Sequence, residues 1–292
     1  MFDFPERYRI PFDGSFKLHE AKTSADHAET EEELDDQLKK LTKKIDKLQQ
    51  TLYAADQYSL LLIFQAMDAA GKDSTIKAIL KGVNPAGCQV FSFKQPSAEE
   101  LDHDFLWRTA RCLPERGRIG VFNRSYYEEV LVVRVHPNYL AGQNLPKVSK
   151  LDKLWEERYE SIKDHEKHLA RNGTIILKFW LNVSKQEQKN RFLARLDEQD
   201  KNWKFSAGDV MERQHWDEYM AAYAEALKAT SSKYAPWYAI PADDKAYMRV
   251  AVAETIVKTL EAMNLEYPEL PAEEQAKFTE ARRLLEAEEP AA

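Results

Sequence analysis

A short segment near the start of the chain combines small and charged residues in a pattern that suits phosphate. Residues 65–75 read Gln-Ala-Met-Asp-Ala-Ala-Gly-Lys-Asp-Ser-Thr and follow the apolar run 60–64. Main-chain N–H groups of such a loop, with the N-terminus of the helix after it, can hold phosphate oxygens, and Lys72 can neutralise their charge. The pattern therefore predicts a phosphate-binding loop and phosphoryl-transfer chemistry.

The segment departs in two places from the usual phosphate-loop pattern G-x-x-x-x-G-K-[ST]. Ala66 replaces the first glycine, and Asp73 stands where a hydroxyl residue normally binds Mg²⁺. Asp68 adds a carboxylate to a loop meant for anions, and it would repel phosphate unless a cation lay between them. We therefore expect Asp68 to contact Mg²⁺ or to act as a base toward an acceptor phosphate. A strand-turn-helix without a ligand is the alternative interpretation.

A second polar cluster follows the apolar segment 118–122, which predicts a short strand. Kinases with a phosphate loop often place a metal-binding carboxylate at this position. Asn123 cannot carry that charge, and Glu128 is the candidate to supply it instead. Arg124 can hold a phosphate group through two parallel hydrogen bonds. A solvated turn at the end of a strand is the plainer alternative.

Composition and charge restrict the class of protein. The chain has 292 residues, of which 43% are hydrophobic and 31% charged, and its net charge is −7. No apolar run approaches the roughly 20 residues of a membrane span, and residues 1–14 are too polar for a signal peptide. Cys88 and Cys112 are expected to be reduced core residues. We therefore expect a cytoplasmic protein that binds neither nucleic acid nor membranes.

Basic residues are concentrated in two parts of this acidic chain. The segment 105–135 has six arginines against three acidic residues, and the segment 171–204 has eight basic against four acidic residues. Basic segments of this kind, next to a phosphate loop, predict a locally focused anion site. An ordinary solvated face is the alternative.

The elements that must position these residues can be predicted from hydrophobic periodicity. Apolar runs predict strands at 60–64, 88–93, 118–122, 174–183 and 238–241, and periodic segments predict helices at 30–54, 73–83, 98–113 and 151–172, with two more after 184 and 206 and a last one ending at 263. Strands that alternate with helices form a parallel sheet, which binds ligands at the carboxyl ends of its strands. We expect one α/β domain at 29–264 with a lid at about 184–213, an irregular arm at 1–28, and a tail or peripheral helix at 265–292.

Capping pairs mark the start of three predicted helices. These pairs are Thr30 with Glu33, Ser184 with Glu187, and Ser206 with Asp209. The first helix carries leucines and an isoleucine at alternating spacings of four and three residues, from 34 to 52. Such a stripe can pair with another chain, although packing within the same domain is the commoner outcome.

Three segments together resemble the family 2 polyphosphate kinases in order and spacing. They are 65–73, 122–128 and 200–205 followed by Asp209, with further likenesses at 132–135, 176–179 and 234–238. The resemblance covers roughly residues 5 to 265. It implies an α/β, P-loop kinase fold that is thymidylate-kinase-like, with three layers, a parallel sheet and a helical lid.

The resemblance also implies a reaction. Such enzymes transfer phosphate reversibly between inorganic polyphosphate and nucleotides, here ADP, AMP, ATP, GDP and GMP, with Mg²⁺ or, alternatively, Mn²⁺. They are typically homo-oligomers, so we expect a homodimer or a homotetramer. Asn123, where many members have aspartate, is similar to the subgroup that phosphorylates both mono- and diphosphates.

The resemblance finally implies roles for particular residues. The catalytic centre would contain Asp68, Lys72, Arg124 and Glu128, with Asp68 and Glu128 as metal ligands. The residues that bind phosphate or nucleotide would be Ala69, Ala70, Gly71, Asp73, Ser74, Asn123 and Tyr127. The polyphosphate path in the lid would be lined by Arg191, Arg195, Lys201 and Lys204. Packing is the commoner role for aromatic residues such as Tyr127. Two other functions stay open, an ATP-dependent nucleoside monophosphate kinase and a non-catalytic nucleotide-binding regulator.

Overall fold

Five parallel strands form the centre of the structure, a computed structural model that describes residues 3–146, 150–200 and 202–288. The strands are β1 (Ser59–Gln65), β2 (Cys88–Ser92), β3 (Ile119–Asn123), β4 (Thr174–Asn182) and β5 (Trp237–Pro241), in the order β2-β3-β1-β4-β5. All five lie where the apolar runs predict them. Because β1 lies between β3 and β4, the loop after β1 emerges at the middle of the sheet.

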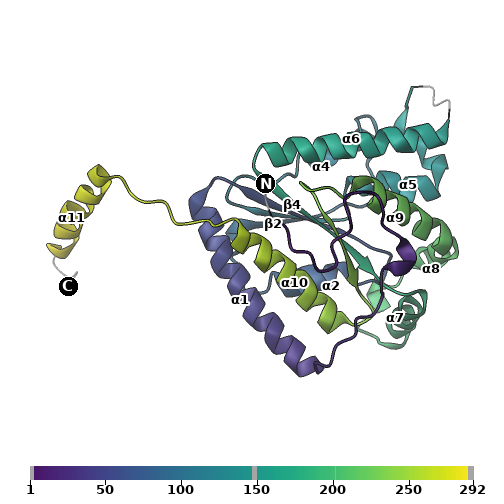
Figure 1. Ribbon diagram of the computed structural model, residues 1–292, viewed down its shortest axis with the longest axis horizontal. Coiled ribbons are helices and arrows are strands. Elements are labelled where there is room, and N and C mark those ends of the chain that lie inside the picture. The colour runs from purple at the N-terminus through teal and green to yellow at the C-terminus, as the bar shows by residue number, and fades with distance from the viewer. Residues whose placement is uncertain (1–2, 147–149, 201, 289–292) are drawn as a thin grey trace.

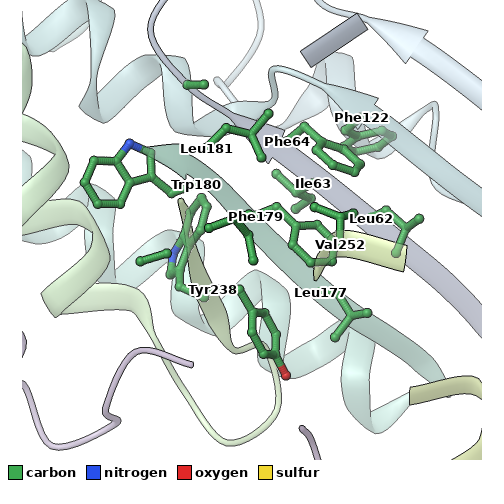
Figure 2. Close-up of a cluster of buried hydrophobic side chains, with 14 of the residues drawn as sticks. Leu62, Ile63, Phe64, Phe122, Leu177, Phe179, Trp180, Leu181, Tyr238 and Val252 are labelled. Atoms are coloured by element: carbon green, nitrogen blue, oxygen red, sulfur yellow. The ribbon is translucent and has the colours of Figure 1, made fainter. Parts of the chain in front are cut away.

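The core lies on both faces of the central strands (Figure 2). Every residue of β1 is buried, as expected for a strand covered by helices on both sides. Phe64 stacks on Phe179 of the neighbouring strand with 5.1 Å between ring centroids. Phe122 meets Phe93 edge to face at 5.0 Å, so aromatic packing continues to the end of β3, where the site begins.

Helices cover the sheet in two layers (Figure 1). One layer contains α1 (Glu31–Ala55), α2 (Lys72–Ile79) and α10 (Lys245–Ala262), and the other contains α6 (Leu151–Arg171) and α9 (Trp216–Thr230). The Thr30 and Glu33 capping box starts α1 as predicted. The apolar stripe of α1, including the buried Leu34, Ile45 and Leu52, faces the domain and α1 packs against α10, so this stripe has an intramolecular partner.

Two predicted helices are interrupted in the structure. The segment 98–113 forms only α3 (Ala98–Leu101) and α4 (Trp107–Ala110), because the Asp104 carboxylate accepts a hydrogen bond from the N–H of Leu106 at 2.9 Å and turns the chain. The segment 206–229 divides into α8 (Ala207–Glu212), a 3₁₀ turn η6 (Arg213–His215) and α9. Ser206 makes no capping bond, and the Asp209 carboxylate pairs with Arg195 instead.

The remaining elements are short connections and the two ends of the described chain. They are the 3₁₀ turns η1 (Leu18–Glu20), η2 (Pro85–Gly87), η3 (Tyr126–Val130), η4 (Pro137–Gln143) and η5 (Asn202–Lys204), and the helices α5 (Val132–Val135), α7 (Lys185–Asp197) and α11 (Ala272–Glu286). The N-terminal arm, otherwise irregular as predicted, borders β5 through an antiparallel bridge between Arg9 and Tyr238. The helix α11 is exposed and lies apart from the body of the molecule (Figure 1). Within the described ranges, no helix has both the length and the apolar character needed to cross a membrane.

Candidate active site

The predicted phosphate loop and the predicted Arg124 segment meet because the strands before them are neighbours. Phe64 of β1 is level with Asn123 of β3, so both chains leave the sheet at the same edge. Three residues of these turns have left-handed backbone, Ala69 with φ 61°, Gly71 with φ 109° and Arg124 with φ 65°. Such conformations cost energy for residues other than glycine and occur often at functional sites.

Arg124 lies between two carboxylates that come from different parts of the sequence. Its Nη2 atom is 2.8 Å from Asp68 Oδ1, and its Nη1 atom is 3.8 Å from Glu128 Oε2. Gln65 holds the other oxygen of Glu128 through a 2.7 Å hydrogen bond from its amide. Burial alone would lower the pKa of Arg124, but Glu128 and Asp68 raise it, so its charge is held firmly. The structure thus brings together three of the four predicted catalytic residues.

Lys72, the fourth of these residues, lies across the phosphate loop. Its ammonium group donates to the carbonyl of Ala66 at 2.7 Å and to that of Met67 at 3.3 Å. The side chain is buried, and this burial lowers its pKa, while nearby Asp68 opposes the shift. A buried cation that is bound to main-chain carbonyls can exchange these partners for phosphate oxygens when an anion enters.

The first turn of α2 is tied to the end of β3. The amide of Asn123 donates to Asp73 Oδ1 at 2.8 Å and approaches Ser92 Oγ at 3.4 Å. The Ser74 hydroxyl donates to the carbonyl of Gly71 at 3.0 Å. Asp73, Ser74 and Asn123 therefore lie beside the loop, as predicted, and Asp73 is paired with an amide in this structure.

A pocket of about 150 Å³ opens between these groups and the helices that follow. It is lined by the predicted Asp68, Arg124 and Glu128 together with Ala66, Met67, Leu131, Val132, Glu212, Tyr219 and Tyr223. This volume is below the roughly 300 Å³ of a small-molecule pocket, so it fits phosphate groups rather than a whole nucleotide. The last five residues were missed from the sequence. Leu131, Val132, Tyr219 and Tyr223 are apolar or tyrosine side chains typical of a core, and Glu212 is an acidic residue in a helical segment without a recognised motif.

The far wall of the pocket is a small polar cluster around Glu212. Tyr219 donates its hydroxyl proton to Glu212 Oε1 at 2.8 Å, and His136 Nε2 lies 3.1 Å from Glu212 Oε2. Tyr223 is buried beside the site, and burial together with the charges of Glu128 and Asp68 raises its pKa well above the ordinary value. Both tyrosines therefore stay neutral near the two catalytic carboxylates.

Arg191, predicted to line the polyphosphate path, is bound to main-chain groups in this structure, and its contact with polyphosphate stays a prediction. Its guanidinium group is buried, and it donates to the carbonyls of Ala69 at 3.2 Å and Ala70 at 2.7 Å. It also donates to Ala242 O at 2.6 Å and to Asp243 O at 3.0 Å. Because all these partners are main-chain carbonyls of two loops, Arg191 joins the phosphate loop to the segment before α10.

The carboxylate of Glu187 also differs from its predicted role. The Ser184 hydroxyl accepts a hydrogen bond from the N–H of Glu187 at 3.0 Å, but the Glu187 side chain binds Arg191 Nε at 2.7 Å instead of closing the capping box. The N–H of Ser184 donates to Asp243 Oδ1 at 2.7 Å. An arginine one helical turn away competes successfully for the carboxylate.

Tyr127 is a second correction, because it does not face the pocket. It is completely buried, and its hydroxyl donates to Glu166 Oε1 at 2.8 Å. Phosphate or nucleotide binding by this side chain is excluded by its position in the core. The general expectation that such aromatic residues pack in the interior is correct for it.

The other predicted lid residues differ in what the structure says of them. Arg195 is partly buried near the site, 3.5 Å from Asp209. Burial and the nearby charge of Asp68 raise the pKa of Asp209, and Arg195 opposes this shift. Lys201 lies outside the described residues, and of Lys204 only the backbone, in η5, is described. Only Arg195 is therefore placed near the catalytic charges.

The donor atoms of the site fit a hard divalent cation. Asp68 and Glu128 supply carboxylate oxygens on either side of Arg124, both at the pocket surface. No cluster of three or more His, Cys, Asp or Glu side chains suited to a metal ion occurs among the described residues. Mg²⁺ needs no such cluster, since it usually binds through one or two carboxylates, substrate phosphates and water.

Comparison with known proteins identifies the family. The family model described as Polyphosphate kinase 2 (PPK2) matches residues 28–268. The chain belongs to the polyphosphate kinase 2 family. The ADP-polyphosphate phosphotransferase of Rhodopseudomonas palustris is 55% identical over 88% of this chain and 89% of its own length. The AMP/ADP-polyphosphate phosphotransferase of Meiothermus ruber is 43% identical over 90% of this chain and 96% of its own.

A solved polyphosphate kinase 2 confirms the fold as well. The crystal structure of the enzyme from Arthrobacter aurescens TC1 matches with a TM-score of 0.84 and 36% identity, over 95% of this chain and 98% of that chain. The α/β fold with a parallel sheet, predicted from the alternation of strands and helices and from the resemblance of three segments, is therefore correct. Polyphosphate kinase 2 proteins use a divalent metal in general, in agreement with the two carboxylates at this pocket.

Proposed function

We propose that this protein transfers phosphoryl groups reversibly between inorganic polyphosphate and nucleotides, with both nucleoside diphosphates and monophosphates as acceptors. One observation carries the proposal: Arg124 lies between Asp68 and Glu128 at the mouth of a phosphate loop whose lysine is buried. Phosphoryl transfer needs positioning and neutralised charge more than a covalent partner, and these groups provide both. The relatives named above act on polyphosphate with ADP or AMP.

The residues of the site divide the work by their chemistry. Lys72 would give up the carbonyls of Ala66 and Met67 and bind phosphate oxygens at the first turn of α2. Arg124 would hold the transferred group through its planar fork of donors. Asp68 and Glu128 would orient Arg124 and, with Mg²⁺ or alternatively Mn²⁺ bound, share a cation that neutralises charge on the phosphate oxygens.

The donor chain would approach along the lid. Arg195 would contact the donor chain, since its partner Asp209 is close enough to Asp68 and Arg124 for their charges to affect its pKa. Lys201 and Lys204 follow in the sequence and remain predicted contacts for polyphosphate. A flexible polyanion without bases or sugars needs repeated cationic contacts, and such contacts suit arginine and lysine.

Several finer features remain part of the proposal. Asn123 would mark the use of AMP and GMP as well as ADP and GDP, because an amide in place of a carboxylate leaves one negative charge fewer beside Asp73. We also retain the homodimer or homotetramer and the cytoplasm as expectations. One relative is a GDP-polyphosphate phosphotransferase of Pseudomonas aeruginosa, which is 32% identical over 65% of this chain. Its name supports guanine nucleotides as acceptors.

One assay tests the function directly. The purified protein is incubated with Mg²⁺, long-chain polyphosphate and either ADP or AMP, without added ATP, and the nucleotides are separated by chromatography. We expect ATP from ADP, and ADP followed by ATP from AMP, with Arg124→Gln as the inactive control. Phosphorylation of AMP only when ATP is the donor would instead indicate a nucleoside monophosphate kinase, and binding without turnover would indicate a regulator.

A further inference from the structure

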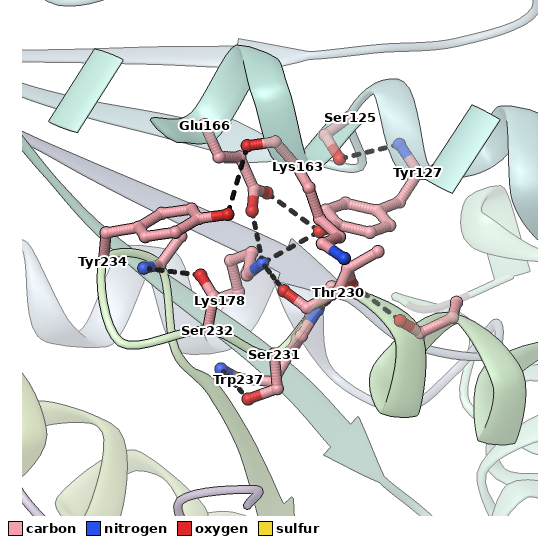
Figure 3. A network of polar contacts seen from close by, with 12 residues as sticks. Ser125, Tyr127, Lys163, Glu166, Lys178, Thr230, Ser231, Ser232, Tyr234 and Trp237 are labelled. Carbon is pink, nitrogen blue, oxygen red and sulfur yellow. Dashed lines mark hydrogen bonds and ion pairs between the residues drawn. The ribbon is translucent and has the colours of Figure 1, made fainter. Parts of the chain in front are cut away.

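A buried ion pair contacts the turn that carries Glu128, and Figure 3 shows its two members, Glu166 and Lys178, beside Tyr127 of that turn. Lys178 of β4 and Glu166 of α6 are 2.6 Å apart, and both side chains are fully buried. Such a pair is not required for stability, because well-packed apolar residues of the same volume often serve as well or better. Its polar partners therefore need a separate explanation.

The hydrogen bonds of this pair are complete. The three protons of Lys178 go to Glu166, to the hydroxyl oxygen of Tyr127 at 2.9 Å and to the carbonyl of Thr230 at 2.9 Å. Glu166 Oε1 accepts the hydroxyl protons of Tyr126 at 3.0 Å and Tyr127 at 2.8 Å. Two consecutive residues of η3 thus bind one buried carboxylate, which fixes this end of the turn to α6.

The next two residues of the turn face in defined directions as a result. Glu129 is buried and bound to Arg158 Nη1 at 2.8 Å, whereas Glu128, between Tyr127 and Glu129, faces the pocket beside Gln65. Arg124 precedes the turn with φ 65°, a backbone conformation that persists only where its surroundings enforce it. The N–H of Arg124 donates to the carbonyl of Phe64 at 3.0 Å, and the two anchored tyrosines follow Arg124 after a single residue, Ser125.

We propose that the network of Lys178, Glu166, Tyr126 and Tyr127, defined here as the tyrosine anchor, positions Arg124 and Glu128 for catalysis. The inference rests on the proposed function, because it assigns the anchor to the reaction of that site. The four residues touch no substrate and act through η3. They explain why polar side chains occupy a part of the core that apolar residues could fill.

The test is the loss of one hydroxyl group. Tyr127→Phe keeps the ring in the core and removes the bonds to Glu166 and Lys178. We expect kcat to fall about tenfold, with the KM for ADP and for polyphosphate changed by less than about twofold, because the catalytic groups are misplaced rather than removed. Tyr238→Phe is the matched control, since its buried hydroxyl donates to Pro5 O at 3.1 Å and lies in β5. This control should keep normal turnover.

A double-mutant cycle separates positioning from a general loss of stability. If Tyr127 acts through Glu128, Tyr127→Phe should have almost no further effect on kcat in a Glu128→Gln background. A purely structural role would lower kcat by the same factor in both backgrounds, and this result would overturn the proposal. Unchanged kcat in the single variant would overturn it as well.

A substrate-free measurement keeps this inference distinct from the proposed function. Absence of turnover in the unmodified protein would refute the function, whereas the crystal structure of Tyr127→Phe tests the anchor alone. We expect that structure to show Glu128 displaced from Gln65. An unchanged position of Glu128 and Arg124 would contradict the anchor even if the enzyme were active.

Discussion

Mutation of two arginines on one helix should affect two different properties, the stability of the protein in one case and the binding of polyphosphate in the other. Arg191 and Arg195 are four residues apart on α7, and the sequence predicted both as polyphosphate contacts. The structure buries the first against main-chain carbonyls and leaves the second partly exposed next to Asp209. We therefore expect Arg191→Ala to lower stability and Arg195→Ala to weaken donor binding.

The magnitude for Arg191 follows from its contacts. Its guanidinium group donates to four carbonyls, at distances between 2.6 and 3.2 Å, and to Glu187 at 2.7 Å. Hydrogen bonds from a charged donor contribute about 1.5–3 kcal/mol each, but they are not additive at one site. Breaking a buried charged contact costs about 3–5 kcal/mol, which corresponds to a fall in Tm of about 10 °C for a chain of this size.

Arg195 should behave as a binding residue. Its ion pair with Asp209 is partly exposed at 3.5 Å, and such pairs contribute about 1 kcal/mol or less. Its removal should change Tm by only about 3 °C or less but raise the KM for long polyphosphate about fivefold or more, with little change for ADP. High salt should reproduce this increase in the unmodified enzyme, because the charge is screened.

The assay combines thermal unfolding with steady-state kinetics in which each substrate is varied in turn. Arg191→Lys serves as an intermediate control, since it keeps the charge but loses most of the donors. The reasoning would be refuted if Arg191→Ala melted within about 2 °C of the unmodified protein while the KM for polyphosphate rose alone. Equal increases in both KM values for Arg195→Ala would argue against a separate polyphosphate contact.

Three further predictions concern single groups. Lys72→Met should retain the fold but lose at least about 10²-fold in kcat, as expected for one transition-state contact, and near-normal turnover would show that the loop is not the active site. Asn123→Asp should lower Tm, because it would place a second carboxylate where the Asn123 amide now donates to Asp73 at 2.8 Å. The double variant Asp73→Asn with Asn123→Asp should restore much of the lost stability. An unchanged Tm in the single variant would contradict this pairing. Burial raises the pKa of Cys88 from 9.0 to about 11, so between these pH values the folded chain keeps a proton that the unfolded chain loses. The free energy of unfolding should therefore fall as the pH rises from about 9 to about 11. Denaturant titrations should show that Cys88→Ala removes this contribution to the pH dependence.

Sequence reasoning predicted best where local chemistry and the strand pattern agree. All five strands, the phosphate loop and the meeting of its residues with the Arg124 segment follow from apolar runs that end in polar residues, because parallel neighbours must end at one edge of the sheet. The ion pair between Asp68 and Arg124 itself was not predicted. Differences arose where side chains had a choice of partners. Asp104 accepts a local hydrogen bond that interrupts one predicted helix, and Asp209 pairs with Arg195 instead of completing the predicted cap with Ser206.

The direction in which a side chain points was the property that was hardest to predict from the sequence. A basic helix in a phosphate enzyme predicts phosphate contacts, yet Arg191 of α7 donates to main-chain carbonyls of two loops, at Ala70 and Ala242. Tyr127 stands next to Glu128 in the chain, but in η3 the side chain of Tyr127 reaches the core and that of Glu128 reaches the pocket. The direction of the Tyr127 side chain depends on Glu166 and Lys178. These two residues are distant from Tyr127 in the sequence and come together where α6 packs on β4. A sequence motif can therefore include a residue such as Tyr127 without revealing that the residue acts through partners far away in the sequence.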